Sequence, residues 1–151
     1  MKVRTSRFGE LDIDEARIIS FTEGILGFSQ HRKYALLEHD ANTPFRWLQS
    51  VENGELAFVV IDPLAVVPDY KAELKPEDIQ DISITNLESA VVFCIVNIAK
   101  GCASVTVNLL SPIVINTEKM LARQVILFNS LYSIQHDLVA PAEAKKSAAA
   151  T

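Results

Sequence analysis

The chain has 151 residues, of which 49% are hydrophobic and 22% charged, a composition typical of a folded globular domain that excludes an intrinsically disordered chain. Fourteen Lys and Arg against nineteen Asp and Glu give a formal net charge of −5. This sign argues against direct binding to nucleic acid or to an anionic membrane, because both present negatively charged phosphates.

The first part of the chain is predicted to form short β-strands. Its apolar clusters are rich in Val, Ile and Phe and are bounded by Gly, Pro, Asn or Asp, which is typical of strands separated by turns. The expected strands are residues 2–6, 10–13, 17–21, 34–38, 45–51 and 56–61. Between two of them, Gly24 and Gly27 are expected to supply unusual backbone angles beside Phe21 and Phe28.

The middle of the chain combines a helix signal with a concentration of acidic residues. Pro76 stands where the first residue of a helix is expected and acids follow it, so a short helix should run from there to about Ile82. Residues 62–88 hold seven acids and two bases, so their net charge equals that of the whole protein. The acids are Asp62, Asp69, Glu73, Glu77, Asp78, Asp81 and Glu88.

The two strands that follow are predicted to form an antiparallel hairpin. Residues 90–99 are apolar on both faces, which indicates a central strand, and residues 104–109 alternate apolar and polar side chains. If Lys100-Gly101 closes a two-residue turn, paired residues sum to 201, and Cys94 faces residue 107 while Cys102 faces Ala99. The two cysteines are then too far apart for a disulfide, and Cys94 is expected to be a buried, inert thiol.

The end of the chain is less clear than the rest. Residues 113–116 suggest a strand, but the next segment has two interpretations: apolar residues recur at helical spacing from Leu121 to Tyr132, whereas residues 124–128 also fit an inner strand. At least eight short strands indicate a sandwich or barrel. We expect one domain over residues 1–139 and a disordered tail over 140–151. The chain shows neither a secretory signal nor a membrane span, so a cytoplasmic protein is expected.

The sequence contains no positive signal for catalysis, for a metal or for a cofactor. His31, His39 and His136 share no metal-ligand spacing, and no serine or cysteine stands in a nucleophile motif. Sequence motifs do not reveal catalytic groups that converge from distant strands. A barrel of this size can enclose a pocket, so one candidate function is a small-ligand or cofactor-binding β-barrel, and a hydrolase is the next candidate.

Three blocks of sequence occur in a distinctive order. They are FTEGILGF (residues 21–28) followed by Tyr34; PFRWLQS (44–50) leading to AFVVIDP (57–63); and TVNLLSPIVIN (106–116) followed by QVIL (124–127). Together they resemble the FliW family of flagellar assembly factors over residues 1–138. The resemblance implies an all-β fold with a minor helix, an antiparallel pseudo-barrel of short strands, in which residues 124–128 form a strand paired with 113–116.

The resemblance also implies a function without catalysis. FliW-like proteins bind newly made flagellin in the cytoplasm. When flagellin is exported, the freed protein binds CsrA, a translational regulator that represses flagellin synthesis by covering the messenger. The implied partners of this chain are therefore CsrA and flagellin, which compete for one protein.

Residues for partner binding are predicted by charge and by side-chain type. The acidic segment 62–88, with the four acids of residues 10–15 as a second contributor, could supply a negative field that opposes the approach of RNA to a basic partner, or could simply keep the domain soluble. Asp69, Glu73, Glu77 and Asp78 are the acids of this segment predicted to act in partner binding. Aromatic side chains near turns are candidate anchors, because such side chains dominate interface energies. These are Tyr34, Phe45, Trp47 and Tyr70. Asn108, Asn116 and Gln124 are expected to satisfy neighbouring backbone groups, with partner contact as the second interpretation.

Overall fold

The computed structural model describes residues 1–38, 42–84, 90–99, 104–127 and 131–138. The strands in these ranges are β1 (Lys2–Thr5), β2 (Gly9–Asp12), β3 (Ile18–Phe21), β4 (Lys33–Leu37), β5 (Phe45–Ser50), β6 (Ala57–Ile61), β7 (Ala90–Ile98), β8 (Val105–Val107), β9 (Ile113–Asn116), β10 (Leu121–Gln124) and β11 (His136–Asp137). The helical segments are η1 (Glu15–Arg17), η2 (Pro63–Ala65), α1 (Pro76–Ile79) and η3 (Gln80–Ile82).

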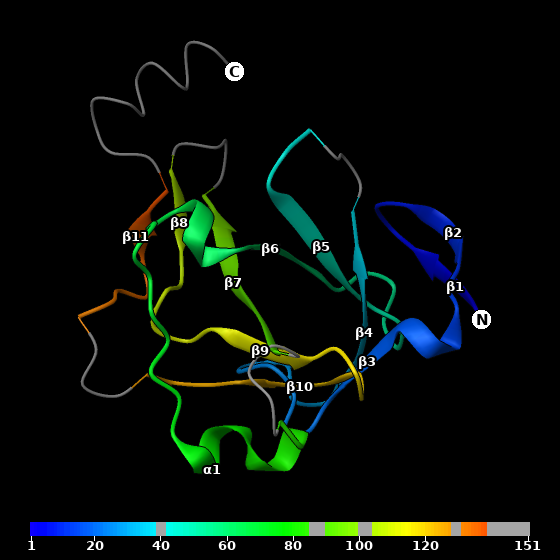
Figure 1. Cartoon of the computed structure of the whole chain (residues 1–151). Coiled ribbons are helices and arrows are strands. Elements are labelled where there is room, and N and C mark those ends of the chain that lie inside the picture. The colour runs from blue at the N-terminus through cyan, green and yellow to red at the C-terminus, as the bar shows by residue number, and fades with distance from the viewer. Residues whose placement is uncertain (39–41, 85–89, 100–103, 128–130, 139–151) are drawn as a thin grey trace.

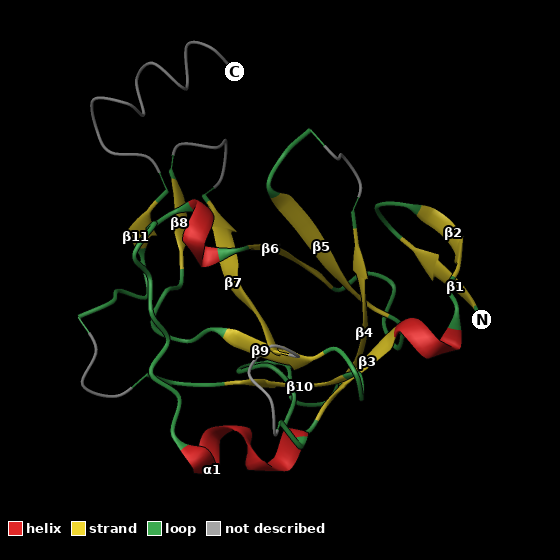
Figure 2. Cartoon of the chain, in the orientation of Figure 1, coloured by secondary structure: helices red, strands yellow, loops and turns green. Residues whose placement is uncertain are grey.

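Seven of these strands close into a barrel. Their order is β7-β6-β5-β4-β3-β10-β9, and β9 returns to β7 through four residue pairs from Ala90↔Asn116 to Phe93↔Ile113. The barrel pairings are antiparallel except for β3 with β10, which run parallel. Strands dominate the chain and helical turns lie outside the barrel (Figures 1 and 2). The prediction of an all-β antiparallel barrel with a minor helix is confirmed, except that β3 and β10 run parallel.

The strands are covered on both faces, which explains why several of them lack polar residues. Successive side chains of a strand point to opposite faces. In β7, Phe93 and Ile95 belong to the barrel interior, whereas Cys94 and Val96 belong to a second core on the outer face. A third, smaller core forms where the β1–β2 hairpin covers the outside of β3 and β4, around Val3, Ile13 and Ala35. The expectation that residues 90–99 form a central strand is confirmed.

The barrel interior is filled by side chains. The buried residues of this core are Ile19, Phe21, Ile25, Tyr34, Leu48, Val60, Ile95, Ile113, Ile115 and Ala122. Phe21 and Phe58 pack against the Tyr34 ring, with ring centroids 5.2 and 6.1 Å away. A ligand-binding barrel needs interior space, which these side chains occupy.

The predicted register of the β7–β8 hairpin is wrong by two residues. Observed pairs such as Val96↔Val107 sum to 203, and the Ala99 amide donates to the Ser104 carbonyl at 2.8 Å. The connection therefore spans residues 100–103 rather than Lys100-Gly101 alone. Cys94 lies opposite Ile61 of β6, is fully buried and is a free thiol. Cys102 lies outside the described residues, as do His39, Phe128 and the tail over 140–151.

The ambiguous segment after Asn116 is a strand, but it begins earlier than predicted. β10 spans Leu121–Gln124, and its pairing with β9 runs from Leu121↔Asn116 to Gln124↔Ile113. The Asn116 side-chain oxygen accepts the amides of Glu118 and Lys119, and this turn reverses the chain within four residues. The ladder continues beyond the strand, because the Val125 and Leu127 amides donate to the Pro112 and Leu110 carbonyls.

The predicted helix is confirmed as α1 followed by η3. Pro76 is its first residue, where the missing N–H costs no helical hydrogen bond. The carboxylate of Asp78, the third helical residue, reaches back to accept the Lys75 amide at 2.8 Å and so caps the helix start. This carboxylate therefore has a local structural role.

Candidate functional site

The segment over residues 62–84 joins β6 to β7 along the outside of the barrel. Its apolar side chains, including Val66, Leu74 and Ile79, pack against the outer core formed by Ile61, Cys94, Val96, Val114 and others. The charged residues between them are exposed, except for the half-buried Asp78. Because the apolar side chains of the segment pack on the barrel, its charged side chains form an acidic outer surface.

Tyr70 anchors the first half of this segment. Its hydroxyl donates to the Leu109 carbonyl at 2.7 Å, and only 8% of the residue is exposed. Its ring lies 4.5 Å from the Tyr132 ring, centroid to centroid, and the Tyr132 hydroxyl accepts the Lys71 amide. Tyr70 was predicted as a partner anchor, but the structure places it inside the fold, where it holds this segment on the barrel.

Arg123 of β10 holds the second half. Its guanidinium donates to the Glu77 carbonyl at 3.1 Å and the Asp81 carboxylate at 3.3 Å, and lies 3.4 Å from the Glu23 carboxylate. The Asn116 side-chain amide adds a bond to the Ile82 carbonyl at 2.8 Å. The α1–η3 segment is therefore tied to the barrel by side chains from β9 and β10.

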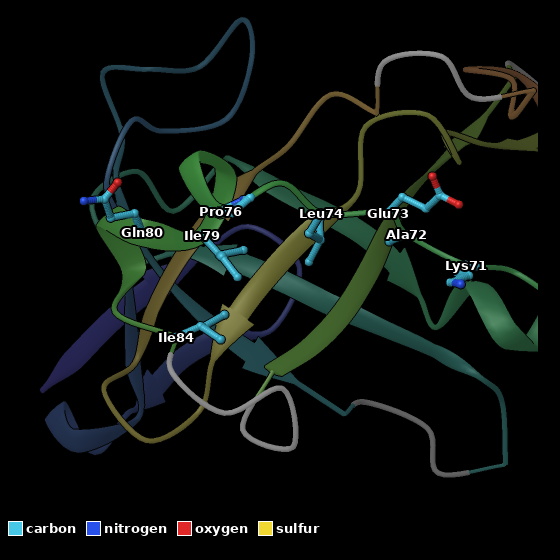
Figure 3. Close-up of a pocket in the computed structure, with 8 residues that line it drawn as sticks. All are labelled: Lys71, Ala72, Glu73, Leu74, Pro76, Ile79, Gln80 and Ile84. Carbon is cyan, nitrogen blue, oxygen red and sulfur yellow. The ribbon is translucent and has the colours of Figure 1, made fainter.

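A groove lies within this segment (Figure 3). Its volume is about 630 Å³, and it is lined by Lys71, Ala72, Glu73, Leu74, Pro76, Ile79, Gln80 and Ile84. Leu74, Ile79 and Ile84 gather in the hollow, while Glu73 and Gln80 lie toward opposite ends of it (Figure 3). The groove is therefore an apolar hollow with polar ends, and we call it the 71–84 groove.

The acids of this region fall into two groups. Asp62 accepts the Leu64 amide, Asp78 caps α1, and Asp81 accepts the Thr22 hydroxyl at 2.8 Å. Asp69, Glu73 and Glu77 are exposed, and none of their side-chain carboxylates has a hydrogen bond or ion pair with another residue that the structure describes, although the Glu77 backbone carbonyl accepts from Arg123. Of the four acids predicted for partner binding, these three are available on the surface.

The remaining aromatic candidates lie in different environments. Tyr34 is fully buried in the barrel interior, so it presents no area to a partner. Phe45 is half-buried and packs on the outer core. Trp47 is also half-buried, with the Phe8 ring edge-on at 5.5 Å and the Arg7 guanidinium carbon 5.3 Å from its centroid. The structure does not bring these side chains together with the acids.

Replacing Trp47 by alanine is expected to lower the free energy of unfolding by about 2 kcal/mol, because the half-buried ring packs against Phe8 and Arg7. Thermal unfolding followed by circular dichroism measures this, with Trp47→Phe as the conservative control. If Trp47→Ala leaves the midpoint unchanged yet abolishes flagellin capture, Trp47 is a partner anchor and not a packing residue.

The three amide side chains satisfy backbone groups, as predicted. The Asn108 oxygen accepts the Ser111 amide at 3.0 Å, and Asn116 is 2% exposed with both ends of its side chain bonded. Gln124 accepts the Leu26 amide at 2.9 Å and donates to the Ser111 carbonyl. These residues connect separate segments of the chain, and partner contact by Asn108 remains a prediction.

The turn held by Gln124 is an exposed feature that the sequence analysis did not single out as a surface. The Phe28 amide donates to the Ile25 carbonyl at 2.7 Å. Gly27 has φ +86, which confirms the unusual backbone angle expected there. Leu26, at the tip, is 63% exposed. The two glycines signalled the turn, but only the structure shows which side chain it presents.

Raising the pH above about 9 is expected to lower the free energy of unfolding. Burial raises the pKa of the Cys94 thiol from 9.0 to about 12, and burial together with nearby Glu52 raises the pKa of the Tyr34 hydroxyl from 10.0 to about 12. Both groups hold their protons more tightly in the folded chain. Their contribution to the free energy of unfolding is therefore complete below the pKa that each group has in the unfolded chain. It is lost as the pH rises through about 12, the pKa of both groups in the folded chain.

Urea unfolding at a series of pH values from about 7 to about 11 measures this loss, which should be of the order of 2 kcal/mol per group. Tyr34→Phe is the control, because it removes the share of Tyr34 while keeping the ring. A free energy of unfolding that stays constant over this range would contradict the predicted burial of the two groups.

Within residues 1–38, 42–84, 90–99, 104–127 and 131–138, no group of three His, Cys, Asp or Glu residues is placed to hold a metal ion. Over the same ranges, no helix is long and apolar enough to cross a membrane.

Comparison with known proteins shows similarity over nearly the whole chain. The family described as FliW protein matches residues 2–138. The flagellar assembly factor FliW of Syntrophus aciditrophicus is 43% identical over 139 residues, which cover 92% of this chain and 88% of that protein. The Geobacter sulfurreducens protein of the same name is 43% identical over 136 residues, covering 90% and 85%.

The fold is also similar to a solved structure. A crystal structure described as that of the flagellar assembly factor FliW superposes with a TM-score of 0.86 at 36% sequence identity. The match covers 93% of this chain and 98% of the other.

Proposed function

This chain belongs to the FliW family of flagellar assembly factors, and on that premise we propose that it binds flagellin in the cytoplasm and, when free, binds the translational regulator CsrA. Binding of CsrA relieves the repression of flagellin synthesis, and no step involves catalysis. The observation that carries the proposal is the family match over residues 2–138, together with the shared barrel.

The surface of the chain supports the CsrA branch of this proposal. CsrA must be basic where it holds RNA, and an acidic protein docked beside that surface raises the cost of bringing phosphates close. The described part of the 62–84 segment carries six acids and two bases, and Asp69, Glu73 and Glu77 face solvent. We assign the electrostatic part of the antagonism to these three carboxylates.

A pull-down with purified flagellin and purified CsrA tests the proposal. The chain should retain each protein separately, and adding flagellin in excess should release CsrA. Binding of neither partner would overturn the proposal. Binding of both partners at once, without mutual release, would overturn the switch while keeping the two interactions.

A further inference from the structure

The 71–84 groove is an apolar surface with no partner among the described residues. Leu74, Ile79 and Ile84 are each only partly buried, although they pack against the outer core with their other sides. The walls come from one continuous segment that is tied to the barrel at Tyr70 and at Arg123. The walls of the groove are therefore fixed to the barrel by contacts that do not depend on an occupant.

The charge beside the groove is negative. Residues 69–81 hold five acids, Asp69, Glu73, Glu77, Asp78 and Asp81, and two bases, Lys71 and Lys75. Glu73 and Lys71 line the groove itself, and Asp69 and Glu77 are exposed beside its lining residues in the chain. Carboxylates without an ion pair are favourable neighbours for cationic side chains. An occupant that suits both features carries apolar side chains on one face and Lys or Arg beside them.

We propose that the 71–84 groove binds an amphipathic helical segment of a partner protein, with apolar side chains in the hollow and basic side chains on Asp69, Glu73 and Glu77. A helix laid in a groove presents residues i, i+3, i+4 and i+7 to an apolar surface, and such anchors fit a volume of about 630 Å³. The inference deepens the proposed function and rests on it, because it names the part of the chain that receives a protein partner.

The test uses fluorescence anisotropy with the full chain and two labelled peptides of about 14 residues, roughly four helical turns. One peptide has leucines at helical spacing with lysines beside them, and the other has glutamates in place of the lysines. The lysine peptide should bind at low salt and the glutamate peptide should bind at least roughly tenfold more weakly. Equal binding of the two peptides, or binding of neither, overturns the proposal.

Matched variants locate the site. The double variant Glu73→Lys with Glu77→Lys should weaken binding of the lysine peptide by roughly tenfold and reduce its salt dependence. Ile79→Ala should weaken it with unchanged salt dependence, because it removes only apolar contact. Two controls, Glu10→Lys with Glu15→Lys and Leu26→Ser, lie on the β1–β2 side and on the exposed turn, and should bind as the unaltered chain does.

The outcomes separate this inference from the function on which it rests. If groove variants and controls bind the peptide equally, the groove is not its site. If the peptide fails to bind while flagellin and CsrA are still retained, only the groove assignment is overturned. If neither protein is retained, the proposed function fails first.

Discussion

Reversing Asp69, Glu73 and Glu77 to lysine is expected to remove most of the ability of this chain to keep RNA off CsrA at low salt. Each replacement changes the local charge by two units, so the outward face of the 62–84 segment turns from acidic to basic. Such a face attracts RNA to the CsrA complex instead of opposing it. We expect a loss of at least roughly tenfold in antagonism.

The measurement is displacement of a labelled messenger leader from CsrA, titrated with each variant at low and at high salt. Exposed charges are screened within about 8 to 10 Å at physiological ionic strength, so the difference between variants should shrink as salt is added. Asp78 is left unchanged because its carboxylate caps α1. Its replacement would confuse loss of charge with loss of the helix start.

The matched control reverses Glu10, Glu15 and Glu55, which are exposed and lie in other parts of the chain. It changes the net charge by the same amount, so it should leave the antagonism close to that of the unaltered chain. If both triple variants lose antagonism equally, net charge matters and the position of the acids does not. If neither loses it at low salt, the three acids serve solubility, which was the alternative interpretation.

Replacing Gly54 by alanine is expected to cost about 3 kcal/mol of unfolding free energy, and to lower the thermal midpoint by roughly 10 °C. A Cβ at this position would stand 1.8 Å from the Arg4 carbonyl oxygen, so β1 or the β5–β6 turn has to move. The Gly54 carbonyl also accepts the Ser6 amide at 3.0 Å and the Gln49 side-chain amide at 3.2 Å. The substitution therefore disturbs the docking of the β1–β2 hairpin.

Gly27→Ala is the matched control for Gly54→Ala. Gly27 has φ +86 but no atom within 4 Å of an added Cβ, so alanine there costs only backbone strain, about 1 kcal/mol. Trp47 is the one tryptophan and packs on Phe8, which lies between β1 and β2, so its fluorescence reports displacement of the β1–β2 hairpin. Equal midpoints for the two variants would contradict the close approach of Gly54 to β1.

The elements that the sequence predicted correctly are those set by local patterns. Strand residues recur with a period of two, and the bounds expected for 45–51 and 56–61 differ from β5 and β6 by one residue. Pro76 with its following acids marked the helix start. The apolar run over 90–99 indicated a strand covered on both faces, which the interior and outer cores confirm.

The errors arose where the alternation of apolar and polar residues does not decide the outcome. The hairpin register depends on the length of its connection, and a shift of two residues keeps every side chain on its expected face, so alternation could not reveal it. The start of β10 depends on the turn made by the Asn116 side chain, which a periodicity analysis does not include. β11 has two residues and no pattern of its own.

For the candidate site too, the sequence located the region but did not show which of its side chains are exposed. Composition located the acids between Asp62 and Glu88, and the resemblance named the partners, but neither distinguished Tyr70 and Tyr34 inside the fold from Trp47 at its surface. Nor did they separate Asp78, which caps a helix, from Glu73 and Glu77, which face solvent.

By itself the sequence determined the strand-rich class, the short helix and the sign and place of the charge, because these follow from residue type and local spacing, and the resemblance of its three blocks indicated the family. Only the tertiary structure decided the closure of the barrel through β7 and β9, the parallel pair of β3 with β10, and the 71–84 groove. Those features depend on contacts between residues far apart in the chain, and such contacts leave no local pattern.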